Sequence, residues 1–172
     1  MDHDADLAVN RYFSGIAEAT FQTHLGVVDP PLVDYVSGLL IRFVHSDVVH
    51  RARGVSGRRL LSVPEMVIEA SSRLGDARRE LHQHIGDFTL FWAGVYPEAL
   101  RQSDDGEKFE TYRCFGKRSY RMASEIESAR DDLPPAGLLE RLSDRFDLCC
   151  YGLREARRMW ETGDGSDHLL IS

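Results

Sequence analysis

Three side chains in the segment 77–96 have the types and the spacing of metal ligands. Glu80, His84 and Asp87 stand at i, i+4 and i+7, which places them on one flank of a helix. Carboxylate and imidazole groups are common ligands of transition metals. His82 projects to the other side of such a helix and is not expected to join them. The plainer interpretation is a solvated flank with a histidine packed at the edge of the core.

A second pair of candidates lies in the segment 31–51. Asp47 falls near the centre of the apolar face there, and His50 follows three residues later on the same side. A buried carboxylate is costly unless hydrogen bonds, a cation or a metal compensate for it. If this face meets the flank that carries Glu80, the two sets form one carboxylate and imidazole site between helices. Pairing of Asp47 with an arginine is the alternative.

A cationic row follows in the segment 107–130, where Arg113, Lys117 and Arg121 stand at i, i+4 and i+8. Such a row suits a phosphate, a carboxylate or an acidic partner. The alternative is an ordinary exposed helix, on which nearby glutamates neutralise the two arginines: Glu110 would pair with Arg113, and Glu125 with Arg121.

Aromatic side chains extend this candidate ligand-binding surface. Tyr112 and Tyr120 fall on the core face of the same helix, while Trp92 and Trp160 belong to two other apolar stripes. Together they would line an aromatic pocket for a ligand. The alternative is that all four are ordinary core residues.

Helices must position these candidates, because apolar residues recur at three- and four-residue intervals along the chain. The clearest seam lies near the C-terminus and consists of Leu139, Leu142, Phe146, Cys149, Leu153, Ala156 and Trp160. No stretch alternates between polar and apolar residues as a half-buried strand does. The sequence therefore predicts an all-α, single-domain bundle of five to six helices.

The predicted helices cover residues 6–25, 31–51, 63–74, 77–96, 107–130 and 136–162, with a loose tail over 163–172. Gly26 is the expected stop of the first helix, and Asp29, Ser62 and Asp76 are the expected N-caps of the next three. The broad apolar face of the second helix indicates a central element. Gly116 in the fifth is small enough to admit a neighbouring helix closely.

The composition, 42% hydrophobic and 28% charged over 172 residues, suits one ordinary globular domain. A net charge of −7 weighs against nucleic acid and anionic lipid as partners. The acidic segment 1–6 lacks the features of a secretory signal, and no apolar run is long enough for a membrane span. We therefore expect a cytoplasmic protein with reduced cysteines: Cys149 in the core, and Cys114 and Cys150 toward the surface.

Three stretches carry a resemblance to a known family: FVHSDVVHR at 43–51, HQHIGDFTLFWAGVYP at 82–97 and YRCFGKRSYRMAS at 112–124. On these stretches the chain resembles an uncharacterised family of bacterial all-helical proteins. The resemblance implies one helical bacterial domain. It carries over no catalytic or binding residue.

The sequence lacks the familiar catalytic motifs, among them paired Glu-x-x-His, a Gly-rich phosphate loop and a Gly-x-Ser-x-Gly elbow. We therefore expect an interaction or scaffold domain that acts through self-association or a protein partner. The alternative is a metal- or small-ligand-dependent enzyme whose carboxylate and histidine centre lies between helices. Its cofactor and substrate are not indicated by any motif.

Overall fold

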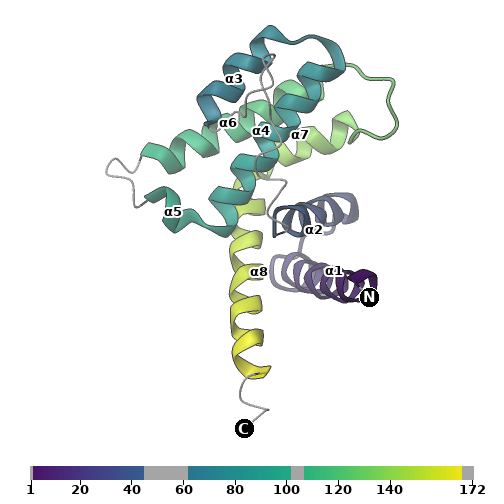
Figure 1. Ribbon diagram of the computed structural model, residues 1–172, viewed down its shortest axis with the longest axis vertical. Coiled ribbons are helices and arrows are strands. Elements are labelled where there is room, and N and C mark those ends of the chain that lie inside the picture. The colour runs from purple at the N-terminus through teal and green to yellow at the C-terminus, as the bar shows by residue number, and fades with distance from the viewer. Residues whose placement is uncertain (1, 45–61, 102–106, 168–172) are drawn as a thin grey trace.

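The computed structural model describes residues 2–44, 62–101 and 107–167, and for residues 2–6, 9, 44, 107 and 164–167 it describes the backbone alone (Figure 1). The described residues form eight α-helices, one π-helix and no strand. The elements are α1 (Asp2–Glu18), the π-helix η1 (Ala19–His24), α2 (Pro30–Val44), α3 (Val63–Ser72), α4 (Gly75–Val95), α5 (Pro97–Arg101), α6 (Glu107–Glu125), α7 (Ala136–Asp144) and α8 (Phe146–Asp167). The predicted all-α class is confirmed, but the expected count of five to six helices is too low.

The central helix is α4, which contacts α2, α3, α5, α6 and α8. In Figure 1, α3, α6 and α7 lie around one end of α4, while α8 extends away from this group with α1 and α2 beside it. The sequence indicated the helix over 31–51 as central. Instead α2 packs mainly on α1, and its broad apolar face is buried because it also contacts α4, α7 and α8.

The last predicted helix is broken at Arg145, where the chain turns from α7, which lies along α6, into α8, which lies along α4. The backbone N–H of Arg145 still donates to the carbonyl of Arg141 at 2.8 Å, and that of Cys149 donates to the carbonyl of Arg145 at 2.9 Å. Because this hydrogen bonding is nearly continuous, the apolar spacing passes through the bend unchanged. The seam residues from Leu139 to Ala156 are buried on both sides of it. Cys150, expected toward the surface, is buried as well.

Other helix ends follow local signals with some exceptions. Ser62 accepts a hydrogen bond from the backbone N–H of Glu65 at 3.3 Å, and Asp29 accepts one from the first turn of α2, so both expected caps are confirmed. The expected cap at Asp76 is wrong, because α4 begins at Gly75, two residues before the predicted start, with Leu74 at the N-cap position. Gly26, with a φ of +62°, follows the first helical segment as predicted.

The remaining differences concern where the predicted helices end. The short α5 follows Pro97, where the sequence predicts only a helix end, and α6 stops at Glu125 rather than at 130. The backbone of α8 is helical to Asp167, so the loose tail does not begin at 163. Residues 45–51 of the second predicted helix lie outside the described residues.

Close packing of α6 on α4 depends on Gly116. A Cβ atom built there would stand 2.3 Å from Oγ1 of Thr89 and 2.5 Å from the ring of Phe146. Both distances are far below van der Waals contact, so only glycine fits. The close approach predicted from the sequence at Gly116 is confirmed.

Candidate functional site

One buried carboxylate links three helices. Asp87 lies in the middle of α4, and its Oδ1 atom accepts hydrogen bonds from the hydroxyl of Tyr120 in α6 at 2.7 Å and from the hydroxyl of Tyr35 in α2 at 2.8 Å. Its Oδ2 atom pairs with Nη2 of Arg42 at 3.4 Å. We call these four residues the Asp87 centre.

Local sequence explains how this centre is assembled. Tyr35 and Arg42 are seven residues apart, so they share one face of α2. Gly86 admits the ring of Tyr120, because a Cβ atom at Gly86 would stand 2.6 Å from that ring. The amide of Gln83 donates to the hydroxyl oxygen of Tyr35 at 3.0 Å, which orients the tyrosine proton toward the carboxylate.

The electrostatics of the centre follow from burial. Burial raises the pKa of Asp87, while the charge of Arg42 and the two tyrosine hydrogen bonds lower it by less. Burial and the adjacent carboxylate raise the pKa values of Tyr35 and Tyr120 well above the ordinary range, so both remain protonated donors. The arrangement is suited to holding helices together, because both carboxylate oxygens of Asp87 and both tyrosine hydroxyls are already paired within the chain.

The three predicted metal ligands of α4 point to different surroundings. Asp87 belongs to the buried centre, Glu80 accepts from Arg130 at 2.5 Å on the surface, and the ring of His84 lies 6.2 Å from that of Phe88. Within the described residues, no group of three or more His, Cys, Asp or Glu side chains is placed to hold a metal. The other two candidate residues, Asp47 and His50, lie outside the described residues.

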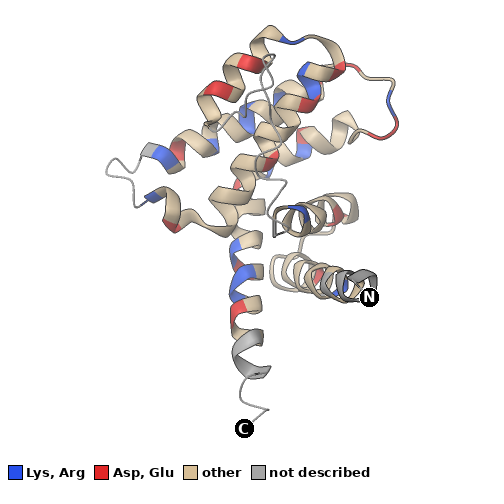
Figure 2. Cartoon of the chain, viewed as in Figure 1, with Lys and Arg blue, Asp and Glu red and all other residues tan. Residues whose placement is uncertain are grey.

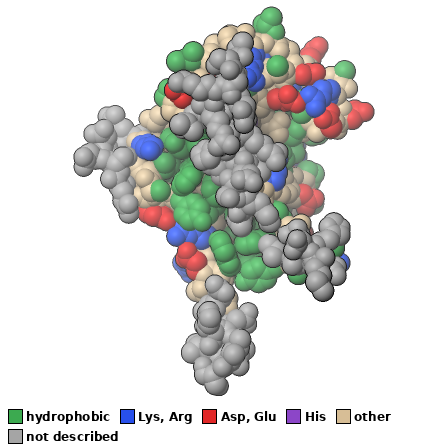
Figure 3. Space-filling view, in the orientation of Figure 1, with side chains coloured by type: hydrophobic (Ala, Val, Ile, Leu, Met, Phe, Trp, Pro, Cys, Tyr) green, Lys and Arg blue, Asp and Glu red, His purple; other side chains and the backbone are tan. Residues whose placement is uncertain are grey.

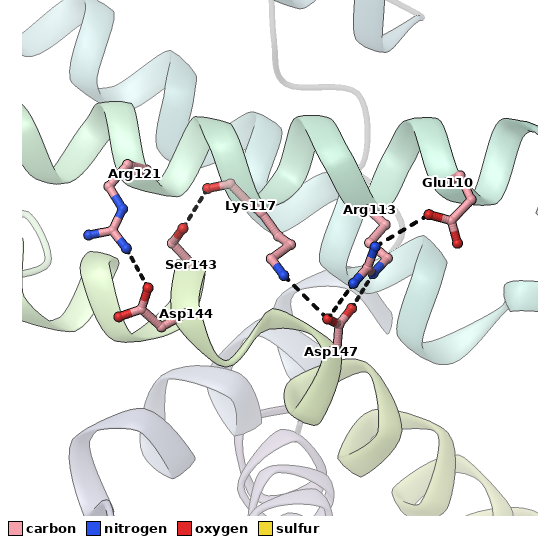
Figure 4. Close-up of polar contacts among 7 residues, drawn as sticks. All are labelled: Glu110, Arg113, Lys117, Arg121, Ser143, Asp144 and Asp147. Atoms are coloured by element: carbon pink, nitrogen blue, oxygen red, sulfur yellow. Dashed lines mark hydrogen bonds and ion pairs between the residues drawn. The ribbon is translucent and has the colours of Figure 1, made fainter.

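The cationic row is neutralised by carboxylates of the same chain (Figure 4). Arg113 holds Asp147 with two hydrogen bonds of 2.5 and 2.8 Å, and Nζ of Lys117 reaches the same carboxylate at 3.3 Å. Arg121 pairs with Glu140 at 2.7 Å and also with Asp144.

These pairs join α6 to α7 and to the start of α8. The expected pairing of Glu110 with Arg113 is present at 3.3 Å, whereas Arg121 pairs across to α7 instead of pairing with Glu125. The hydrogen bonds from Arg113 lower the pKa of Asp147. To bind an external anion, the three side chains of the row would have to give up these carboxylate partners.

Two of the candidate aromatic residues, Tyr112 and Trp92, share Phe88 as a neighbour, and the other two lie elsewhere. The half-buried Tyr112 lies 6.1 Å from Phe88, ring centre to ring centre, and the ring of Phe88 lies 6.4 Å from that of Trp92. Trp160 instead packs edge-on against Phe13 of α1 at 5.1 Å. Tyr120 is buried in the Asp87 centre. The four aromatic residues therefore do not line one common pocket.

An open depression of about 540 Å³ lies beneath the connection between α6 and α7. Its two arginines are engaged: Arg79 donates to the carbonyl of Pro134 at 2.7 Å, and Arg130 pairs with Glu80 and with Asp132, each at 2.5 Å. A ligand here would compete with the chain's own acceptors.

Sequence reasoning missed two features. The seven-residue spacing of Tyr35 and Arg42 indicates only that they share one face of a helix. It does not predict that Asp87, on another helix, is their partner. His82 was set aside because it projects to the side of the helix away from Glu80, His84 and Asp87, yet it is buried, with 3% of its surface exposed. It lines a separate cavity of about 100 Å³ between α3, α4 and α6.

Comparison with known proteins returned nothing: no family model, no curated protein and no solved structure matched the chain. The site must therefore be interpreted from its own geometry. Among the described helices, none combines the length and the apolar character that crossing a bilayer requires.

Proposed function

We propose that this chain is an interaction domain that self-associates through the outer side of α3. The observation that carries the proposal is the exposure of two large apolar side chains close together in sequence: Ile68 is 71% exposed and Leu74 is 81% exposed. Figure 3 shows hydrophobic side chains protruding at the end of the molecule where α3 passes into α4. We call Ile68, in α3, and Leu74, at the N-cap position of α4, the α3 ridge.

The charge pattern of α3 favours a second copy of the chain as the occupant. Glu65 lies in its first turn, and Arg73, which follows its last residue, pairs with Glu69 of the same helix at 3.2 Å. If two copies pack antiparallel, the acidic first turn of each helix faces the end of the other that carries Arg73, whereas parallel packing brings the two acidic first turns together. By contrast, the extending part of α8 carries interspersed charges of both signs, including the pairs of Arg157 with Glu161 and Arg158 with Glu155 (Figure 2).

The expected association is weak. Two ridges bury four large apolar side chains, worth about 1.5–3 kcal/mol each. Association costs about 4–15 kcal/mol in lost freedom of motion. The most favourable balance of these two ranges is about 8 kcal/mol, which corresponds to a micromolar dissociation constant, so the dimer we propose is weak and reversible.

Native mass spectrometry of the full chain, purified without chelator or affinity metal, tests the proposal. We expect monomer and dimer of the 19.5 kDa chain, with the dimer fraction rising as concentration increases through the micromolar range. A monomer at every concentration contradicts self-association and leaves a different protein as the partner to be sought. The same spectrum reports any retained ligand.

A metal- or small-ligand-dependent enzyme remains the second candidate. What favours a small ligand over a metal is the cavity beside His82, since the described residues supply no metal-binding group. We further propose a cytoplasmic location, no nucleic-acid partner, and membership of the bacterial helical family that the sequence resembles. The net charge of −7 supports the absence of a nucleic-acid partner. The resemblance of the stretch over 82–97, most of which lies in α4, supports the family membership.

A further inference from the structure

The cavity of about 100 Å³ between α3, α4 and α6 is lined by both polar and apolar side chains. The polar lining residues are His82, Arg118, Ser71 and Ser119. The hydroxyl of Ser71 donates to a backbone carbonyl of its own helix at 2.9 Å, so its oxygen can still accept a hydrogen bond. These groups belong neither to the Asp87 centre nor to the α3 ridge.

His82 is the key residue, because its imidazole is buried and neither ring nitrogen has a hydrogen-bond partner. Unpaired polar atoms in the interior cost free energy, so such groups generally have a partner in the functional state. Burial, reinforced by Arg78 and Arg118, lowers the pKa of His82 to about 4. The ring is therefore neutral at neutral pH and presents one N–H donor and one acceptor.

The charged and apolar groups around the His82 ring favour a ligand that is an anion with a small apolar part. The positive charges of Arg78 and Arg118 favour a negative ligand, and the imidazole N–H donates to it. The rest of the lining consists of Val67, Phe115 and Met122, which suit an alkyl group and not a fully polar ion. A cavity of about 150 Å³ accommodates a benzene molecule, so this one suits a ligand of about four or five non-hydrogen atoms.

We propose that this cavity binds a short-chain monocarboxylate, with its carboxylate toward His82 and Arg118 and its alkyl end against Val67, Phe115 and Met122. The proposal does not depend on self-association through the α3 ridge, and the two are tested by different measurements.

Titration of the full chain with sodium propionate at constant ionic strength, followed through the ring resonances of His82 by NMR, tests the site. We expect a saturable shift with a millimolar dissociation constant. Arg118→Met should weaken binding at least fivefold, because it removes one of the two cations. Arg158→Met, which removes an exposed arginine from α8, is the matched control and should bind like the wild type.

His82→Leu separates a binding role from a structural one. Leucine fills the space without polar atoms, so this variant should unfold at an equal or higher denaturant concentration and should show no propionate binding in a ligand-observed saturation-transfer experiment. A non-saturable shift in the wild type, as a cavity holding only water would give, overturns the proposal. So does equal weakening by the two arginine variants, or inorganic phosphate binding as tightly as propionate.

Discussion

The hydroxyl of Tyr120 donates a 2.7 Å hydrogen bond to Oδ1 of Asp87 where α6 packs on α4. Tyr35 donates to the same oxygen from α2, so one carboxylate fixes the positions of three helices that are distant in sequence. The surrounding contacts are mostly apolar and permit some sliding of one helix on another. We infer that this polar centre sets their register.

Tyr120→Phe should lower the free energy of unfolding by about 1.5–3 kcal/mol, the usual contribution of a hydrogen bond to a charged group. The ring still fills the space beside Gly86, so packing changes little. Urea unfolding measures the effect. Tyr151→Phe, whose side chain is 48% exposed, is the control and should change the value by less than about 0.5 kcal/mol. Equal effects for both variants would refute the role of Tyr120.

Asp87→Asn should change the pH dependence of stability. Because burial raises the pKa of Asp87 above its ordinary 3.8, the folded protein retains this proton to higher pH than the unfolded chain does. The stability of the wild type relative to the variant should therefore fall as pH rises from 3.8 through the folded pKa. Urea unfolding of both proteins from acid to neutral pH measures this difference, and a difference that rises with pH contradicts the assignment.

Asp147→Asn should have the opposite pH dependence. Hydrogen bonds from Arg113 lower the pKa of Asp147 below its ordinary 3.8, so its stabilising effect is present at neutral pH and is lost as pH falls through the folded pKa. The side chain is 52% exposed, and solvent screening limits the loss at neutral pH to about 0.5–1 kcal/mol. Asp131→Asn, in the connection before α7, is the control. An effect that persists at low pH would exclude ion pairing as the cause.

Two glycine-to-alanine substitutions should change the stability of the protein in opposite directions. Gly116→Ala places a Cβ atom 2.3 Å from Thr89 and should destabilise the protein by at least about 2 kcal/mol. Gly38→Ala, within α2, meets no atom within 4 Å and should stabilise it by about 0.5–1 kcal/mol. Thermal unfolding of both variants tests the close contact between α6 and α4. Two changes of the same sign would contradict it.

The helices were predictable where the cause is local. The spacing from Leu139 to Ala156 correctly identified buried positions, and Ser62 with Glu65 identified a helix start. The bend at Arg145 was not predictable from periodicity, because backbone hydrogen bonds continue almost unbroken on both sides of it.

The candidate site was harder to predict because its determinants lie on different helices. Asp87 was named only as a candidate metal ligand beside Glu80 and His84. Its true neighbours, Tyr35 and Tyr120, come from other helices, and only the fold brings them together. Side-chain spacing within one helix reports a shared flank but does not reveal what faces it.

Sedimentation equilibrium of the wild type, Ile68→Glu and Val28→Glu tests the central claim most directly. Both variants place a carboxylate on an exposed apolar position, but only Ile68 belongs to the α3 ridge; Val28, which is 91% exposed, lies between η1 and α2. We expect the wild type and Val28→Glu to form dimers at micromolar or higher concentration and Ile68→Glu to remain monomeric with unchanged helicity. Equal association of all three proteins, or a monomeric wild type, would contradict self-association through the α3 ridge.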